Sequence, residues 1–196
     1  MPECVVISAS PSASSKTLKI AKFIGERLET LGLTSALIDV RLLPPAELIA
    51  ANTSSPDIAR ALSLIDSARS LVIASPVYKA AYSGLLKVFL DVLPQYGLRE
   101  KVIFPLLTGA SPAHVLAIDY ALRPMLCSMD PRQILPGLFI IDKQVEYSDG
   151  GKLRLPEEVS VKLEAILKSL IAWRRFGKDS VIAAAEQLHR PGSPIV

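Results

Sequence analysis

Short apolar runs alternate with segments of helical spacing along this chain, and this alternation restricts the possible fold more than any other feature. The apolar runs have the length and composition of buried β-strands. The expected strands cover residues 4–7, 34–40, 70–75, 101–107 and 134–141, and the expected helices cover residues 18–31, 55–68, 83–93, 112–129 and 156–176. Because parallel strands need helical crossovers, the order predicts an α/β fold: a doubly wound, five-stranded parallel sheet with helices on both faces.

Prolines and glycines predict irregularities in this pattern. Pro136-Gly137 interrupts the fifth strand, which therefore belongs at a sheet edge, and Pro124 should kink or divide its helix. Helical spacing continues or restarts from Asp179 to Leu188. We expect one domain over residues 1–190 and a disordered tail over residues 191–196.

The composition excludes several classes of protein. The 196 residues carry a net charge of +3 with scattered lysines and arginines, which does not indicate nucleic-acid binding. No apolar stretch reaches the roughly 18–20 residues that a membrane span needs, and no secretory leader is recognisable. Cys4 and Cys127 lack metal or disulfide spacing and are interpreted as core thiols. These features predict a soluble cytoplasmic protein without a metal site.

A hydroxyl-rich turn follows the first strand. Residues 8–17, Ser-Ala-Ser-Pro-Ser-Ala-Ser-Ser-Lys-Thr, contain five serines and no glycine, and a helix follows. Helix N-termini bind phosphate through unpaired N–H groups and partial positive charge, and hydroxyls donate further hydrogen bonds. The turn matches neither a dinucleotide fingerprint nor a P-loop, so it favours a terminal phosphate monoester. The alternative is that the serines serve only as caps and turn residues.

Two more turns follow the third and fourth strands. Residues 75–84 begin with Ser-Pro and end with Gly84, and residues 108–111 read Thr-Gly-Ala-Ser. Ligands of such folds bind at the carboxyl ends of the strands, so the three turns should converge on one edge. A phosphate site beside two small-residue loops that border a flat ring is what FMN requires.

These stretches resemble a known family. Residues 75–87 are similar to the flavin loop of the NAD(P)H-dependent FMN reductases, and residues 10–17, 108–114 and 117–124 agree with it. The resemblance is greatest to the reductase component of bacterial two-component alkanesulfonate monooxygenases, because of the tyrosine-containing segment around Tyr120. It implies a flavodoxin-like sheet with strand order 2-1-3-4-5.

The resemblance also implies a set of binding residues. It places three groups of residues around FMN: Ser10, Ser15, Lys16 and Thr17 at the phosphate; Pro76, Val77, Tyr78, Lys79 and Gly84 along the isoalloxazine; and Thr108, Gly109, Ala110 and Ser111 at its pyrimidine side. Lys79 has an equally simple interpretation as a partner in a surface salt bridge. Many relatives have arginine at the position of Ser12, so this chain has lost a charged phosphate donor. That loss implies weaker FMN retention or a changed choice between NADH and NADPH.

Two further residues need separate interpretations. In the resembling subfamily a tyrosine at the position of Tyr120 accompanies a π-bulge at a tetramer interface; helical spacing alone would also suit a core or interface aromatic. His114 is not assigned to catalysis, because hydride passes directly between the two cofactors and needs no protein proton donor at that step.

The resemblance implies an enzyme that reduces FMN with NADPH or NADH and supplies reduced FMN to a monooxygenase partner, as a dimer or tetramer. One alternative is a quinone or azo reductase with FMN as a bound prosthetic group. A flavodoxin-like electron carrier is the other, but such carriers are strongly acidic and this chain has a charge of +3.

Overall fold

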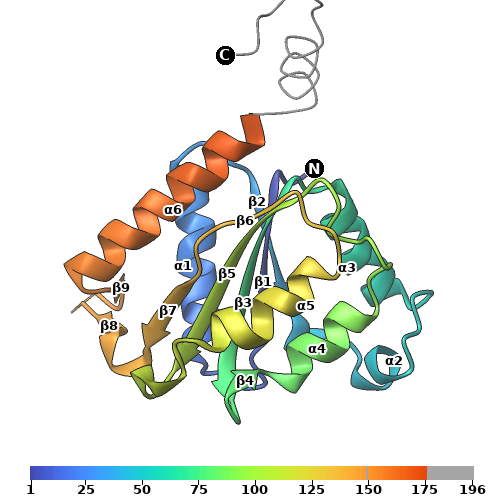
Figure 1. The fold of residues 1–196 in the computed structure, drawn as a ribbon, viewed down its shortest axis with the longest axis horizontal. Coiled ribbons are helices and arrows are strands. Elements are labelled where there is room, and N and C mark those ends of the chain that lie inside the picture. Colours follow the sequence, from blue (N-terminus) through green and yellow to red (C-terminus); the bar gives the residue numbers. More distant parts are fainter. Residues whose placement is uncertain (149, 176–196) are drawn as a thin grey trace, which may run out of the picture.

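A mostly parallel sheet lies at the centre of the molecule, with helices on both faces (Figure 1). This computed structural model describes residues 1–148 and 150–175. The strands are β1 (Cys4–Ser8), β2 (Ser35–Asp39), β3 (Ser70–Tyr78), β4 (Ala81–Tyr82), β5 (Val102–Gly109), β6 (Gln133–Ile134), β7 (Leu138–Ile141), β8 (Glu146–Tyr147) and β9 (Leu153–Arg154). The α-helices are α1 (Lys16–Thr30), α2 (Pro45–Ile49), α3 (Pro56–Ser67), α4 (Gly84–Asp91), α5 (Arg123–Cys127) and α6 (Glu157–Arg175).

The order of the sheet agrees with the prediction. Neighbouring strands run β2-β1-β3-β5-β6, with β7 also paired to β5 and β4 paired to β3. The fifth position of the predicted 2-1-3-4-5 order is therefore shared by β6 and β7. The short β8–β9 pair forms a separate two-stranded sheet.

Two hydrophobic clusters separate the helices into two layers. One cluster joins α1 and α6 to the sheet, and the other joins α3, α4 and α5 to the opposite face. Strands β1 and β5 are buried over nearly their whole length, as is β3 as far as Pro76, because their apolar runs face a helix layer on each side. Polar groups of the sheet are consequently concentrated at the strand ends.

Proline explains why the fifth strand is divided. Pro105 lies in β5, and the carbonyl of Ile103 accepts a hydrogen bond from Leu135 N–H, so odd-numbered residues of β5 face the fifth strand. Pro105 has no N–H to offer on that side, and the partner strand breaks opposite it at Pro136-Gly137. Gly137 is also required by packing, since a Cβ there would lie 2.5 Å from Cγ2 of Ile118.

The helix predicted over residues 112–129 is wrong as a continuous element. The structure has a 3-10 turn over Pro112–His114, a π-helix over Ile118–Leu122 and then α5. In a regular α-helix, the ring of Pro124 would clash with the carbonyl of Tyr120 four residues earlier. The wider turn avoids this arrangement, and the N–H of Arg123 donates instead to the carbonyl of Ile118, five residues earlier.

Strand β3 is longer than predicted, and the hairpin that follows it was not predicted. It continues through Pro76 to Tyr78 and pairs antiparallel with β4. The two residues between the strands, Lys79 and Ala80, have φ values of 49° and 65°. Positive φ at both central residues is the pattern of a type I′ turn, which normally uses asparagine or glycine, so no sequence signal marked this hairpin.

Some expectations are corrected or lie outside the described residues. Cys4 is buried, but Cys127 is exposed, so its interpretation as a core thiol is wrong. It is the last residue of α5, a five-residue helix with one buried residue, Leu126. The expected helix over residues 179–188 and the tail over residues 191–196 lie outside the described part, and the single domain over residues 1–190 stays a prediction. Within residues 1–148 and 150–175, no helix combines the length and apolar character needed to cross a bilayer.

The buried thiol of Cys4 predicts a loss of stability in alkali. Burial raises the pKa of Cys4 from its ordinary value of 9.0 to about 12. The folded protein keeps a proton that the unfolded chain releases, so this contribution is complete below pH 9.0 and is lost as the pH rises toward 12. In the wild type, we expect the free energy of unfolding to fall by up to about 1.4 kcal/mol per pH unit over that range because of this thiol. Cys4→Ala should lack this contribution to the fall, and urea unfolding at several pH values measures it.

Cys127→Ala is the control for this measurement, because it removes an exposed thiol instead. It should keep the pH dependence of the wild type. The same alkaline slope in Cys4→Ala and in the wild type would contradict the assignment.

Candidate functional site

A cavity of about 520 Å³ opens at the carboxyl ends of β1, β3 and β5. All three turns singled out in the sequence contribute to it, so their predicted convergence is confirmed. The lining residues are Ser10, Ser12, Ser15, Lys16, Thr17, Pro76, Val77, Tyr78, Thr108, Gly109, Ala110 and Asp142.

The first turn of α1 presents hydrogen-bond donors to this cavity. Ser15 is the N-cap, and its hydroxyl accepts from the N–H of Leu18 at 3.2 Å. Within the described chain, no acceptor is found for the backbone N–H groups of Lys16 and Thr17. These groups, together with the serine hydroxyls of the turn, form the donor set that a phosphate monoester requires.

Thr17 connects two of the turns. Its buried hydroxyl lies 2.7 Å from the hydroxyl of Thr108 at the end of β5, and either oxygen can be the donor. This bond ties the start of α1 to the β5 turn. The side of the cavity formed by these two turns is thereby held in place.

Asp142 is a lining residue that sequence reasoning missed. Its backbone carbonyl accepts a hydrogen bond from the ammonium group of Lys16. Asp142 directly follows β7, whose carboxyl end lies at the same sheet edge as the three turns. Its position after a parallel strand was therefore the signal that could have identified it.

Serine hydroxyls also connect the β1 and β3 turns. Ser83 caps α4 by accepting from the N–H of Leu86 at 3.1 Å, and its hydroxyl donates to the carbonyl of Ala9 at 2.6 Å. The hydroxyl of Ser75 accepts from the N–H of Ser83 at 2.9 Å. Because both serines are buried, these bonds fix the segment that leads from β3 to α4 against the end of β1.

Three of the predicted binding residues do not line the cavity. Lys79 lies at the tip of the β3–β4 hairpin, Gly84 begins α4, and Ser111 caps the 3-10 turn that starts at Pro112. All three are exposed, and no heavy atom lies within 4 Å of the position that a Cβ would take at Gly84. His114 is likewise exposed and lies outside the cavity lining.

Tyr120 contacts the hairpin from the π-helix. Its hydroxyl donates a hydrogen bond to the carbonyl of Ala80, and its side chain is otherwise exposed. The π-helical geometry that the resemblance implies around Tyr120 is present over Ile118–Leu122. The π-helix thereby supports a turn that carries two residues with positive φ.

The residues of the cavity fit FMN chemically. One end offers hydroxyls, free N–H groups and the single ammonium of Lys16, which suits a phosphate. The other end has Pro76, Val77 and Tyr78 beside the small residues Gly109 and Ala110, which leaves room for a flat heterocycle. Asp142 is the single acidic residue among the described residues that line the cavity.

Comparison with known proteins agrees with this chemistry. The family model described as NADPH-dependent FMN reductase matches residues 2–146. The chain belongs to this family. The expectation of an FMN reductase that uses FMN and NADPH or NADH is thereby confirmed at the level of the family.

Individual relatives support the same assignment. The FMN reductase (NADPH) of Pseudomonas putida is 38% identical over 148 residues, which are 76% of this chain and 75% of the relative. The FMN reductase (NADPH) of Escherichia coli is 38% identical over 141 residues, 72% of this chain and 74% of the relative. Among solved structures, the apo form of an NADH:FMN oxidoreductase (EMOB) has a TM-score of 0.78 and 35% identity and covers 89% of each chain.

Proposed function

We propose that this reductase supplies reduced FMN to a partner flavin-dependent monooxygenase of the alkanesulfonate type. The observation that carries the proposal is the cavity itself, in which a phosphate-type donor set and a small-residue ring site adjoin at one sheet edge of a chain from this family. FMN, when bound, takes up a hydride from the nicotinamide of NADPH or NADH.

The protein contributes binding and alignment to this reaction. Ser10, Ser15, Lys16 and Thr17 hold the phosphate, while the segments around Pro76–Tyr78 and Thr108–Ala110 border the ring. The buried bonds of Thr17, Ser75 and Ser83 fix these segments in advance, so less ordering is needed when the ligands bind. No side chain is assigned a proton-transfer role.

The site also suits a flavin that leaves after reduction. Among the described residues that line the cavity, Lys16 has the single ammonium group, and Tyr78 is 49% exposed. A phosphate held by one cation and neutral donors is bound less tightly than one held by several cations. Weak retention is what a reductase requires when its reduced flavin passes to another protein.

A homo-oligomer, as a dimer or tetramer, is part of the same proposal. Val115, Leu116 and Tyr120 are large side chains that lie exposed close together in sequence on and beside the π-helix. An apolar face of this kind favours a symmetric contact with a second copy. We expect light scattering at micromolar concentration to give two or four times the chain mass of 21.1 kDa; a monomer mass would contradict the proposal.

The alternative enzyme is a quinone or azo reductase on the same fold, with FMN as a permanent group. The two readings differ in whether flavin is exchanged. Two residues favour a flavin that is exchanged. Ser12 stands where many relatives have an arginine that would hold the phosphate, and Tyr120 matches the reductase components of two-component monooxygenases.

Flavin dependence of the activity tests the proposal directly. We expect nearly colourless purified protein whose NADPH or NADH oxidation rises with added FMN over a micromolar range. The measurement is absorbance of the purified protein, followed by coenzyme oxidation with and without FMN. Yellow protein whose rate of coenzyme oxidation does not change with added FMN but depends on a quinone or a dye would establish the alternative.

The role of Lys16 can be isolated by comparing two flavins. Lys16→Met should raise the dissociation constant for FMN about 10-fold or more, because it removes a charge-assisted contact to phosphate. Riboflavin has no phosphate, so its affinity should not change. Quenching of flavin fluorescence on binding measures both constants.

Lys162→Met provides the matched control, because Lys162 is an exposed lysine on α6 that pairs with Glu158 and does not line the cavity. It should bind both flavins as the wild type does. If Lys16→Met weakened FMN and riboflavin equally, Lys16 would act through its bond to the Asp142 carbonyl and not on the phosphate.

A further inference from the structure

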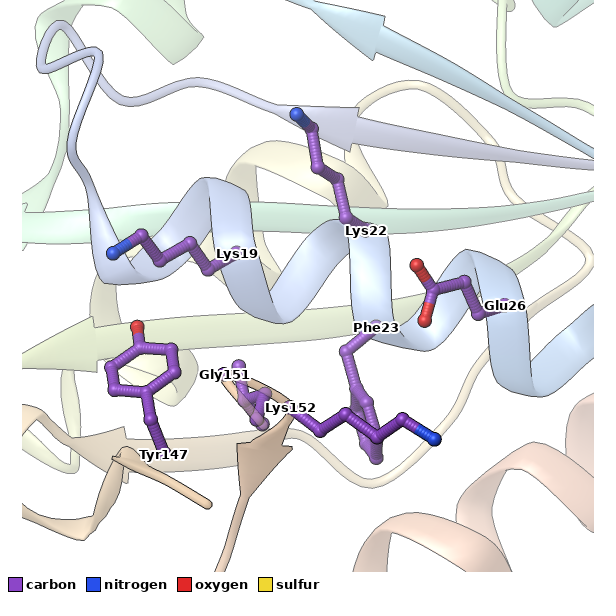
Figure 2. Close-up of a pocket in the computed structure, with 8 residues that line it drawn as sticks. Lys19, Lys22, Phe23, Glu26, Tyr147, Gly151 and Lys152 are labelled. Atoms are coloured by element: carbon purple, nitrogen blue, oxygen red, sulfur yellow. The ribbon is translucent and has the colours of Figure 1, made fainter. Parts of the chain in front are cut away.

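A second and larger cavity, of about 760 Å³, lies between α1 and the β8–β9 hairpin (Figure 2). We call it the hairpin pocket. Its side chains include Lys19, Lys22, Phe23 and Glu26 from α1, and Tyr147 and Lys152 from the hairpin segment. None of these residues belongs to the cavity at the carboxyl edge, so the flavin site does not explain their arrangement.

The hairpin pocket carries an excess of positive charge. Three lysines and one carboxylate, Glu26, line it, although the Lys22 side chain projects to the other side of α1. Within residues 1–148 and 150–175, no carboxylate lies within 4.0 Å of any of the three ammonium groups. Unpaired like charges around one concave surface raise its potential and favour an anionic ligand. The ligand chemistry is therefore that of a phosphate or another strong anion.

Aromatic side chains give the pocket a second property. The Tyr147 ring is partly exposed, and the ammonium of Lys19 lies 4.8 Å from its centroid. Phe23 extends from the same face of α1 toward Lys152 (Figure 2). Aromatic surface beside ammonium groups suits a ligand that combines a flat ring with phosphate, as nucleotides do.

The ammonium groups are spread along the pocket. Figure 2 shows Lys19 above the Tyr147 ring, Lys152 beside Phe23, and Lys22 projecting to the other side of the helix. Lys22 therefore adds to the charge around the pocket without facing a ligand in it, while the ammonium groups of Lys19 and Lys152 lie toward different ends of the pocket. A ligand with separated negative charges, such as a dinucleotide that carries an additional ribose phosphate, matches this spacing better than one compact anion.

The hairpin pocket also adjoins the flavin cavity. Lys16 lines the flavin cavity and Lys19 lines the hairpin pocket, and they are three residues apart on α1, a rise of about 4.5 Å. Asp142 and Tyr147, which line the two cavities from the other side, are five residues apart. The two cavities therefore adjoin at the phosphate end of the flavin cavity, which is where a dinucleotide extending from the flavin ring would enter the hairpin pocket.

We propose that the hairpin pocket binds the adenosine end of NADPH, with Lys19 and Lys152 contacting its 2′-phosphate and diphosphate and Tyr147 packing against adenine. The proposal rests on the proposed function and assigns the coenzyme selectivity of that same site. It identifies Lys19 and Lys152 as the residues that favour NADPH over NADH, which lacks the 2′-phosphate.

Nucleotide fragments test this assignment without turnover. Isothermal titration calorimetry of the full chain with adenosine 2′,5′-bisphosphate and with adenosine 5′-monophosphate should show tighter binding of the bisphosphate by about 10-fold. A Lys19→Gln/Lys152→Gln variant should lose this preference. Tyr147→Ala should weaken both fragments by similar factors, because adenine is common to them.

Steady-state kinetics provides the second readout. The double variant should raise the KM for NADPH about 10-fold and the KM for NADH by a clearly smaller factor, because the two coenzymes share the diphosphate but only NADPH has the 2′-phosphate; its kcat should not change. Raising the salt concentration should increase the wild-type KM for NADPH more than that for NADH. Lys162→Gln removes an exposed lysine of α6 that pairs with Glu158 and lines neither cavity, and it should behave as the wild type.

Two results would overturn the assignment. One is equal affinity of the wild type for the two fragments. The other is a double variant that loses thermal stability but keeps the wild-type ratio of NADPH to NADH efficiency, since the lysines would then only hold the hairpin against α1. Either result leaves the proposed function intact as long as the protein still reduces FMN with NADH. If the wild type reduces FMN with neither coenzyme, the proposed function itself is refuted.

Discussion

Burial of the three central strands on both faces is the constraint on which the rest of this structure depends. Strands β1, β3 and β5 lie between two hydrophobic clusters that belong to opposite helix layers. Polar side chains within these strands would have no water and few partners. The chain therefore places its hydroxyls, free N–H groups and Lys16 where the strands end, and parallel pairing brings those ends to one edge. The position of the site follows from the packing of the core.

Local signals in the sequence predicted most of the architecture. Continuous apolar runs identified the buried strands, and helical spacing identified the helices that begin at Pro56 and Gly84. The irregular elements depended on contacts between distant residues. The break between β6 and β7 reflects Pro105 on the neighbouring strand as well as Pro136-Gly137 in the strand itself. The hairpin at Lys79-Ala80 uses residues that do not normally adopt positive φ, so turn chemistry gave no indication of it.

The candidate site likewise contains residues that local sequence signals identified and residues that only the folded structure brings together. Residues of the three turns predicted at the carboxyl ends of strands, such as Lys16, Tyr78 and Thr108, were assigned to the cavity and line it. Asp142 was missed because only the turns after the first, third and fourth predicted strands were assigned to the site. The hairpin pocket was beyond sequence reasoning for a different reason: Lys19 and Lys152 are far apart in the chain, and packing of the hairpin against α1 brings them to one surface. A local sequence pattern cannot predict a charge cluster formed by residues that are distant in the chain.

The divided fifth strand also affects how copies of this protein behave at high concentration. An uninterrupted edge strand presents a row of unpaired N–H and C=O groups to which a strand from another chain can be added. Here that edge consists of a two-residue strand and a four-residue strand separated by Pro136-Gly137. Neither segment is long enough to template extended pairing, and proline cannot complete the ladder between them. The irregularity that accommodates Pro105 thus also protects an apolar, sheet-rich protein against edge-to-edge aggregation.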